Sequence, residues 1–329
     1  MTEAGCSGTL AEKARDMGTM RTEERPEGRN ASARRYVDIL SDAGFKAVFG
    51  DQRNKDVLLD LLNVVLPPHR KVDDISYSTT ELPGLTLSNK NVRLDLRCTG
   101  RDGTVFIVEV QCYRQENLFS RCVGYAARVY DSGTERGDGQ RYDIPPVYFI
   151  CLLGDGAEGF DREGPMWEDR FISEYTFREK TSNDVPAETI FCIFVELNRF
   201  RKDLQECGSE EDRWCYALKR VGTLDGLPDG LREDAFERLF RACEIARFDR
   251  DRRLTYENDM ITERDYWNII DTAARQGRAE GKAEGLAEGK AEGLAEGRIK
   301  IARAFKEQGV AAETISAATG LSIEEIEAL

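Results

Sequence analysis

Two stretches of alternating side chains joined by a short turn constrain the fold of this chain more than any other pattern in it. In Val92–Cys98, apolar and polar residues alternate with the period of a β-strand, and Thr104–Cys112 is an apolar, β-branched run whose second half alternates in the same way. Between them, residues 101–103 read Arg-Asp-Gly, and the glycine supplies the left-handed conformation that a three-residue hairpin loop needs. The sequence therefore predicts an antiparallel β-hairpin.

The length of this loop fixes which residues face each other across the hairpin, namely those whose numbers sum to 204. On one face every pair is apolar: Leu94 with Val110, Leu96 with Val108, and Cys98 with Phe106. On the other face Asp95 lies opposite Glu109, and Arg93 lies opposite Gln111. Directly opposed side chains have Cβ atoms about 5 Å apart. Two carboxylates at that separation repel unless a cation, a shared proton or a nearby arginine compensates.

A carboxylate pair with an amide beside it offers only oxygen ligands, which Mg²⁺ and Mn²⁺ prefer. A divalent cation held there lowers the pKa of a bound water and polarises a phosphoryl oxygen. Arg93 and Arg97 flank Asp95 on the same strand face, where they are placed to meet phosphates. The alternative is a solvent-facing strand surface with ordinary charged residues, and the spacing alone does not decide between the two.

The rest of residues 35–200 predicts an α/β core. The runs Val147–Leu153 and Ile190–Leu197 are apolar throughout, as in strands that are buried on both faces, and Ile172–Phe177 is a weaker edge strand. Apolar residues at helical spacing add a helix that ends at Gly50, one from Asn54 to Pro67, and one over about Glu116–Tyr130.

The single histidine of the chain, His69, narrows the chemistry. A site with two histidine ligands is excluded, and a Ser-His-Asp triad would have to use a residue that follows Pro67-Pro68 in a loop. Carboxylates must therefore carry out any hydrolysis. The net charge of −14 excludes a generally basic protein that coats nucleic acid, but not an enzyme with a local basic groove.

The cysteines and the hydropathy of the chain bear on its compartment. There are nine cysteines, an odd number without a CxxC pair, which predicts reduced thiols in a reducing cytosol. The N-terminus has no signal-peptide pattern, and no apolar run reaches the length of about 18 residues that spans a bilayer. We therefore expect a soluble cytoplasmic protein.

Three segments outside the core have distinct compositions. Residues 1–34 are polar without a hydrophobic period, which predicts a disordered leader. Residues 201–276 predict a helical region in which Ser209 and Thr262 open helices through capping boxes, with another helix at about Leu231–Phe248. Residues 299–329 predict a small helical tail. Its last helix has three glutamates and no basic residue, which favours packing or an oligomer contact over DNA recognition.

Residues 277–298 form a low-complexity repeat with a glycine at every fourth position from Gly277 to Gly297. Glycine inside a helix costs about 1 kcal/mol relative to alanine, and glutamates four residues apart repel weakly. A lone helix is therefore disfavoured. One interpretation is a flexible linker or fraying helix, and the other is close contact between helices of a homo-oligomer.

Several motifs together resemble those of a known nuclease family. Asp95 on one strand, followed by Glu109-Val110-Gln111 on the next, resembles the core of PD-(D/E)XK nucleases with glutamine in place of the usual lysine. Residues 41–67 are similar to the opening motif of the recombination-promoting nuclease (Rpn) and transposase family, and residues 116–130 to its helix with an arginine and a tyrosine. The repeat and the ending TGLSIEEIEAL are also typical of that family, so the resemblance covers about residues 36–329.

The resemblance implies a PD-(D/E)XK, restriction-endonuclease-like core, with a mixed sheet flanked by helices, followed by an all-helical C-terminal region. It implies a bacterial DNA endonuclease of recombination-promoting or transposase type that depends on Mg²⁺ or Mn²⁺. The alternative is a catalytically inactive nuclease-fold module that binds a partner and self-associates through the repeat. The negative charge and the acidic last helix favour this alternative, whereas the retained acidic pair favours the enzyme.

The resemblance also implies roles for individual residues. Asp95 and Glu109 would hold the metal, with the Val110 carbonyl as a third ligand, and Gln111 would take the place of the lysine. An amide orients water but adds no positive charge. The accessory residues are Asp42 as a further acidic ligand, and Lys46, Arg121 and Tyr125 as residues that line the site. The simpler alternatives are a helix cap for Asp42, a solvated charge for Lys46, and an i, i+4 packing pair for Arg121 with Tyr125.

Overall fold

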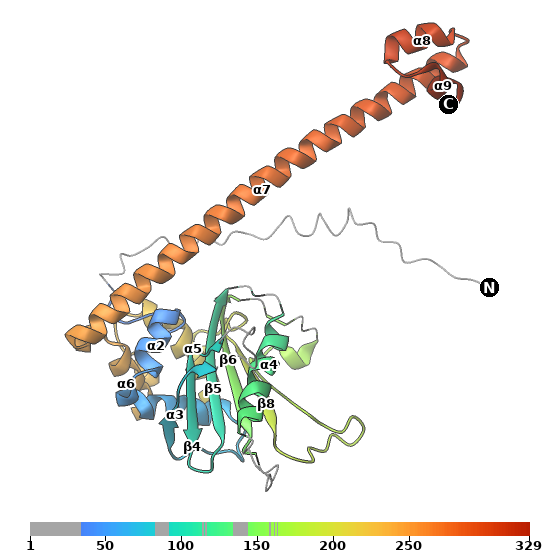
Figure 1. Cartoon of the computed structure of the whole chain (residues 1–329). Helices are drawn as coiled ribbons and strands as arrows, with labels where there is room; N and C mark the ends of the chain where they lie inside the picture. Colours follow the sequence, from blue (N-terminus) through green and yellow to red (C-terminus); the bar gives the residue numbers. More distant parts are fainter. Residues whose placement is uncertain are drawn as a thin grey trace. The chain divides into compact units, whose positions relative to one another are not determined.

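The computed structural model describes residues 34–82, 92–113, 115, 117–133, 144–157, 159–160, 162 and 164–329. Within them, a six-stranded sheet has the order β1-β4-β5-β6-β8-β7 (Figure 1). Its strands are β1 (Ile75–Tyr77), β4 (Leu96–Gly100), β5 (Val105–Tyr113), β6 (Val147–Gly156), β7 (Ile172–Thr176) and β8 (Ile190–Glu196). A two-stranded sheet pairs β2 (Glu81–Leu82) with β3 (Val92–Arg93). The predicted leader, residues 1–34, lies outside the described residues except for Arg34.

The hairpin of β4 and β5 has the predicted register. Leu96 lies opposite Val108 and Cys98 opposite Phe106, in an antiparallel ladder. Gly103 adopts a φ of +85° in the loop, the conformation for which glycine was expected there. The predicted hairpin is therefore confirmed from Leu96 onward.

Upstream of Leu96 the predicted register is wrong. Arg93 lies in β3 opposite Glu81, and not opposite Gln111. The amide of Leu94 donates to the carbonyl of Thr80 at 2.9 Å, which turns the chain toward β2 before it joins β5. As a result, the Leu94 and Leu96 side chains do not share one face as predicted: they pack in two different hydrophobic clusters.

The centre of the sheet is parallel, with β6 between β5 and β8. Side chains of β6 are buried on both faces, as the uninterrupted apolar run Val147–Leu153 predicts. The antiparallel strand β7 pairs only with β8 and forms one edge of the sheet, as predicted. The predicted α/β architecture, a mixed sheet flanked by helices and followed by a helical C-terminal region, is confirmed.

Helices cover both faces of this sheet (Figure 1). One cluster of buried residues joins the sheet to α2 (Asp42–Phe49), α3 (Lys55–Val65), α5 (Glu210–Arg220) and α6 (Asp234–Cys243). The other cluster joins it to α4 (Leu118–Ser132). The predicted helical region therefore contributes α5 and α6 to the same core as the sheet. Short 3-10 helices lie at η3 (Gln52–Asn54), η4 (Pro165–Trp167), η5 (Leu204–Glu206), η6 (Val221–Thr223), η7 (Asp229–Leu231) and η8 (Ile245–Arg247).

The helix starts show which polar residues act as caps. The Ser41 side chain accepts a hydrogen bond from the amide of Gly44 and caps α2, so the alternative interpretation of Asp42 as the cap is wrong. The Ser209 side chain caps α5 as predicted. Thr262, by contrast, lies inside a longer helix, α7 (Arg250–Glu307). The second predicted helix start is therefore wrong.

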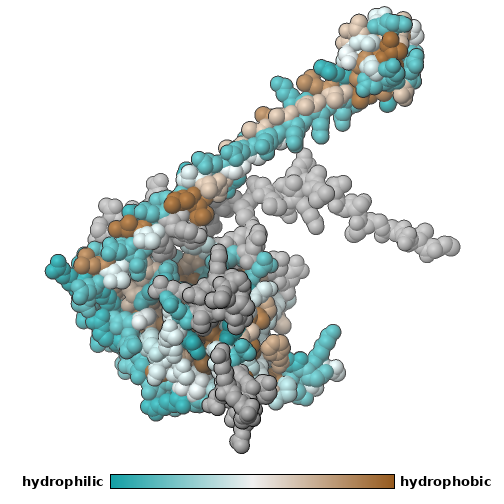
Figure 2. Space-filling model, viewed as in Figure 1, coloured by the Kyte–Doolittle hydropathy of each residue, from teal (hydrophilic) through white to brown (hydrophobic). Residues whose placement is uncertain are grey.

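The C-terminal part of the chain consists of helices. The whole glycine repeat lies within α7 and is helical, and both the linker interpretation and the oligomer interpretation stay predictions. After α7 come α8 (Ala312–Thr319) and α9 (Ile323–Glu327), whose small core is formed by Ala302, Ile315 and Ile326. The chain divides into two compact units, with the boundary between Asp259 and Met260. Figure 2 shows apolar residues interspersed with hydrophilic ones along α7.

Two further predictions concern the cysteines and membranes. The described cysteines, which leave out Cys6, are free thiols and most of them are buried. No helix in the described part of the chain combines the length and the apolar character needed to cross a membrane.

Candidate active site

The two carboxylates of the hairpin lie side by side, each held by the backbone of the other strand. The amide of Asp95 donates to Oε1 of Glu109 at 3.2 Å. In return, the amide of Val110 donates to Oδ2 of Asp95 at 3.1 Å. Asp95 occupies the bend between β3 and β4, where its amide is free of the β4–β5 ladder. The predicted proximity of the pair is therefore observed, through reciprocal hydrogen bonds.

Burial makes both carboxylates unusually weak acids. Glu109 is only 5% exposed, and desolvation followed by the charge of Asp95 raises its pKa to about 8. Desolvation also raises the pKa of Asp95 to about 6, although the hydrogen bond from Val110 opposes this shift. The two groups titrate as a pair, so the metal-free site holds at least part of a proton at neutral pH.

Asp42 and Lys46 reach the pair only through their charges. The Asp42 carboxylate raises the pKa of both Asp95 and Glu109, and the Lys46 ammonium lowers that of Asp95. Lys46 itself forms an ion pair with Asp42, with 2.6 Å between Nζ and Oδ2, across one turn of α2. The two opposite charges therefore largely offset each other at the pair.

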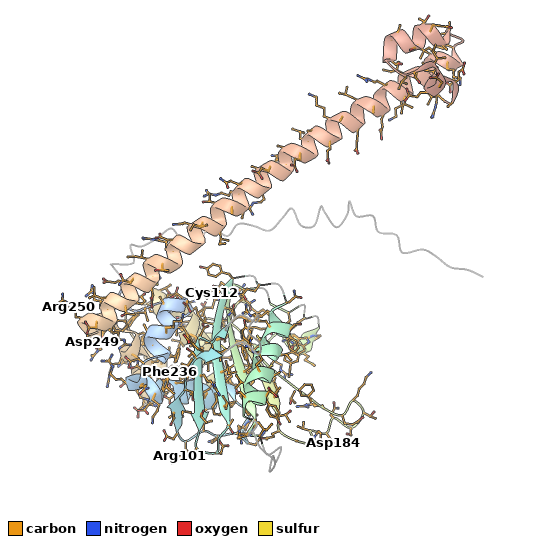
Figure 3. The ribbon with its side chains drawn as sticks, viewed as in Figure 1. Arg101, Cys112, Asp184, Phe236, Asp249 and Arg250 are labelled. Atoms are coloured by element: carbon orange, nitrogen blue, oxygen red, sulfur yellow. The ribbon has the colours of Figure 1, made fainter. Side chains whose placement is uncertain are left out.

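Gln111 lies on the same strand face as Glu109, two residues farther along β5, and is 8% exposed. Its neighbour in β6 is Leu153, which packs in the cluster beneath α4. The ladder between β5 and β6 becomes irregular just beyond Gln111, next to Cys112. Figure 3 labels Cys112, near the C-terminal end of β5, and Arg101 in the hairpin loop.

Arg121 and Tyr125 project from successive turns of α4, the helix on the same face of the sheet as Glu109. The Arg121 guanidinium lies over the Tyr125 ring, 5.8 Å from its centroid. In addition, the Arg121 charge lowers the pKa of both carboxyls of the pair. The structure thus brings Arg121 to the predicted site, and it also supports the packing pair with Tyr125.

Two cysteines that the sequence did not single out lie where α4 packs on the sheet beside the pair. Cys151 is the β6 neighbour of Glu109, and it shares a buried cluster with Cys122 of α4. Cys122 directly follows Arg121 in the chain. The position of Cys151 in the middle of the apolar run 147–153 predicts that it is buried. That it lies next to Glu109 can be inferred only once the register of β5 and β6 is known.

The two predicted phosphate-binding arginines lie apart. Arg93 is in β3, outside the six-stranded sheet. Arg97 lies opposite Ile107, two residues nearer the hairpin loop than the carboxylate pair, and its half-buried position lowers the pKa of its guanidinium. Its buried Nε has no hydrogen-bond partner within the described residues.

The donor atoms at this site suit a hard divalent cation with few protein ligands. Asp95 and Glu109 supply carboxylate oxygens, and Val110 and Gln111 supply a carbonyl and an amide oxygen on the same stretch of β5. In the part of the chain that the structure describes, no group of three or more His, Cys, Asp or Glu side chains is placed to hold a metal ion. Asp42 is therefore not positioned as a third acidic ligand, and water would complete the coordination of Mg²⁺ or Mn²⁺.

Comparison with known proteins gives one match. The profile of the family described as PD-(D/E)XK nuclease family transposase matches residues 39–273. That span contains the carboxylate pair and α2 to α6, and it ends before the glycine repeat. Neither the curated proteins nor the solved structures yield a match to the chain. The family resemblance drawn from the motifs is thereby confirmed.

Proposed function

The chain belongs to the PD-(D/E)XK nuclease family transposases, and from this premise we propose that it is a DNA endonuclease that depends on Mg²⁺ or Mn²⁺. The observation that carries the proposal is the reciprocal hydrogen bonding of Asp95 and Glu109, which buries two acidic groups side by side. The energetic cost of that arrangement is relieved when a divalent cation replaces the proton.

In this proposal each residue at the site has a distinct task. Asp95 and Glu109 bind the cation, with the Val110 carbonyl as the third protein ligand. The cation, when bound, lowers the pKa of a coordinated water and polarises the phosphoryl oxygen. Gln111 orients the attacking water through its amide, and Asp42 tunes the affinity for the cation through its negative charge.

DNA reaches this site despite the negative charge of the chain because only a local basic surface is required. Arg97 meets a phosphate next to the scissile one, and Arg93 adds positive charge at the margin of the site. We place this activity in recombination-type DNA processing in the bacterial cytoplasm. The free cysteines support a reducing compartment of that kind.

The proposal is tested by incubating the full-length protein with supercoiled plasmid and Mg²⁺ or Mn²⁺. We expect nicked or linear product, and we expect EDTA, Asp95→Asn and Glu109→Gln each to lower the cleavage rate by about 10³-fold. Asp60→Asn is the matched control, because it removes a carboxylate of α3 that pairs with Arg238 of α6 and with no residue of the site. Absence of product with both metals, or full activity in both site variants, would contradict the proposal.

A second candidate function is self-association through α7. The repeat leaves Leu286 73% and Leu294 57% exposed, and a Cβ built on any glycine from Gly277 to Gly297 meets no atom within 4 Å. A solitary helix with this composition is poorly stabilised, so a second copy of α7 is the partner we propose. Sedimentation of the full chain and of a chain truncated after Ala274 tests this, and an equal number of protomers in both would contradict it.

A further inference from the structure

The replacement of lysine by Gln111 leaves the proposed nuclease without the positive charge of its family motif. A lysine at that position orients the attacking water and offsets negative charge on the transition state, whereas a neutral amide provides only the first. If the proposed function holds, another cation must therefore face the scissile phosphate. Three described cations are candidates: Lys46 and Arg121 act on the carboxylate pair through their charges, and Arg97 lies two residues beyond Asp95 along the same stretch of chain.

Two of these cations are poorly placed for this task. Lys46 is engaged with Asp42 at 2.6 Å, so its charge is already neutralised on α2. Arg97 lies opposite Ile107, two residues along the strand from the pair and nearer the hairpin loop. At about 3.3 Å per residue, that displacement matches a neighbouring phosphate better than the scissile one.

Arg121 is positioned over the pair by contacts that do not involve the pair itself. Cys151 is the cross-strand neighbour of Glu109, and Cys122 of α4 packs in the same buried cluster as Cys151. Both cysteines are fully buried, so this point of α4 is fixed against the sheet. Arg121 immediately precedes Cys122 and therefore lies at the level of Glu109, on the face that also carries Gln111.

The Arg121 guanidinium is also available for an anion. Its Nε is buried and has no hydrogen-bond partner within the residues that the structure describes. The Tyr125 ring, 5.8 Å away, orients the guanidinium without neutralising it. A buried donor without an acceptor is costly, and a phosphate oxygen would satisfy it with a charge-assisted hydrogen bond.

We propose that Arg121 replaces the missing lysine: it binds a non-bridging oxygen of the scissile phosphate from α4, while Gln111 orients the water from β5. The two tasks of one lysine are thus divided between two residues on facing elements. Tyr125 is a positioning residue that holds the guanidinium through its ring. The inference rests on the proposed nuclease function and deepens it.

The experiment compares four full-length proteins: wild type, Arg121→Gln, Gln111→Lys, and the double variant. Single-turnover plasmid cleavage gives the rate constant, and a filter-binding assay without metal gives the DNA affinity. We expect Arg121→Gln to lower the rate constant about 100-fold with little change in DNA affinity. In that background Gln111→Lys should restore at least about tenfold, because it returns the charge to the position that the family motif uses.

Two further variants separate this role from a structural one. Arg128→Gln changes an arginine two turns farther along the same face of α4 and should keep the wild-type rate constant. Arg121→Lys keeps the charge and should retain more activity than Arg121→Gln. Thermal unfolding shows whether each variant is folded as the wild type is.

The outcomes distinguish the two proposals. Wild-type cleavage together with an Arg121→Gln variant of equal rate overturns this inference and leaves the proposed function intact. A loss in Arg121→Gln that Gln111→Lys does not rescue also overturns it, and assigns Arg121 to packing with Tyr125. A wild-type protein that cuts with neither metal overturns the proposed function, and this inference with it.

Discussion

The sheet domain and the repeat segment of α7 are both regular, but different forces make them so. In the sheet domain, helices such as α6 bury Phe236, Leu239 and Phe240 in the core, where α6 packs on α2 and α3. In the repeat, by contrast, apolar side chains such as Leu286 lie in solvent, and the glycines have open space around them. Tertiary packing therefore determines the helices of the first region, while local hydrogen bonds alone support the second. The catalytic proposal therefore depends on the burial of the carboxylate pair in the sheet domain, whereas the assembly proposal depends on the exposure of apolar side chains along the repeat.

The largest effect that would sharpen this comparison is a loss of packing. Phe236→Ala removes a ring that is 2% exposed and contacts Trp214, so we expect the free energy of unfolding to fall by about 3–5 kcal/mol. The matched change Leu294→Ala removes a side chain from the exposed face of α7 and should cost less than about 0.5 kcal/mol within one protomer. Urea unfolding monitored by tryptophan fluorescence measures both. Similar costs would show that α7 is packed in solution.

A smaller effect concerns the buried carboxylates. Both pKa values are raised above those of the unfolded chain, so the folded state binds more protons than the unfolded state between about pH 4 and pH 8. The stability of the metal-free protein is therefore fully present below that window and declines as the pH rises through it. Each unit of pKa difference between the folded and the unfolded chain corresponds to about 1.4 kcal/mol, and Glu109, whose pKa is raised more, contributes the larger share of this decline.

The amide variant isolates this contribution. Glu109→Gln removes the group with the larger shift, so its unfolding free energy should change less with pH and should exceed that of the wild type at pH 8 without metal. Asp60→Asn, away from the pair, should keep the wild-type pH dependence. Denaturant midpoints at pH 5 and pH 8 measure these differences. A steeper decline in Glu109→Gln than in the wild type would contradict the description of the pair.

The smallest effect concerns the glycines of the repeat. Gly285→Ala and Gly289→Ala should each stabilise α7 by about 1 kcal/mol if the helix is solitary, because alanine lowers the backbone entropy lost on folding. Circular dichroism during heating would show this as a helical transition at higher temperature. A decrease in stability would indicate instead that a second helix approaches these glycines closely, as the assembly proposal requires.

Sequence periodicity could predict most of the sheet because burial imposes it. The apolar runs of β6 and β8 and the alternation in β5 are direct consequences of which faces are covered. The proximity of Asp95 to Glu109 followed from the loop length. The position of Arg93 did not, because the hydrogen bond between Leu94 and Thr80 depends on β2, a distant segment that leaves no mark near the hairpin.

The errors at helix boundaries have a local cause. The pattern at Thr262 is a valid start signal, but the helix already runs through it from Arg250, so the signal is not used. Similarly, aspartate is a common N-cap residue, but at the start of α2 it is Ser41, the neighbour of Asp42, that caps the helix. The position of α4 beside Glu109 was beyond prediction, since it depends on how the apolar face of α4 packs on β6 and β8, which are distant in the sequence.

The hairpin loop has a consequence for how this chain can vary. Because Asp95 and Glu109 are each held by an amide of the opposite strand, their separation is set by the number of residues between them. The length of the loop at residues 101–103 therefore sets the register of the two strands. Substitutions there are tolerated as long as the turn closes, whereas one inserted residue turns one acidic side chain toward the opposite face of the sheet. The geometry of the carboxylate pair is thus determined by the length of a loop that does not itself contact the pair.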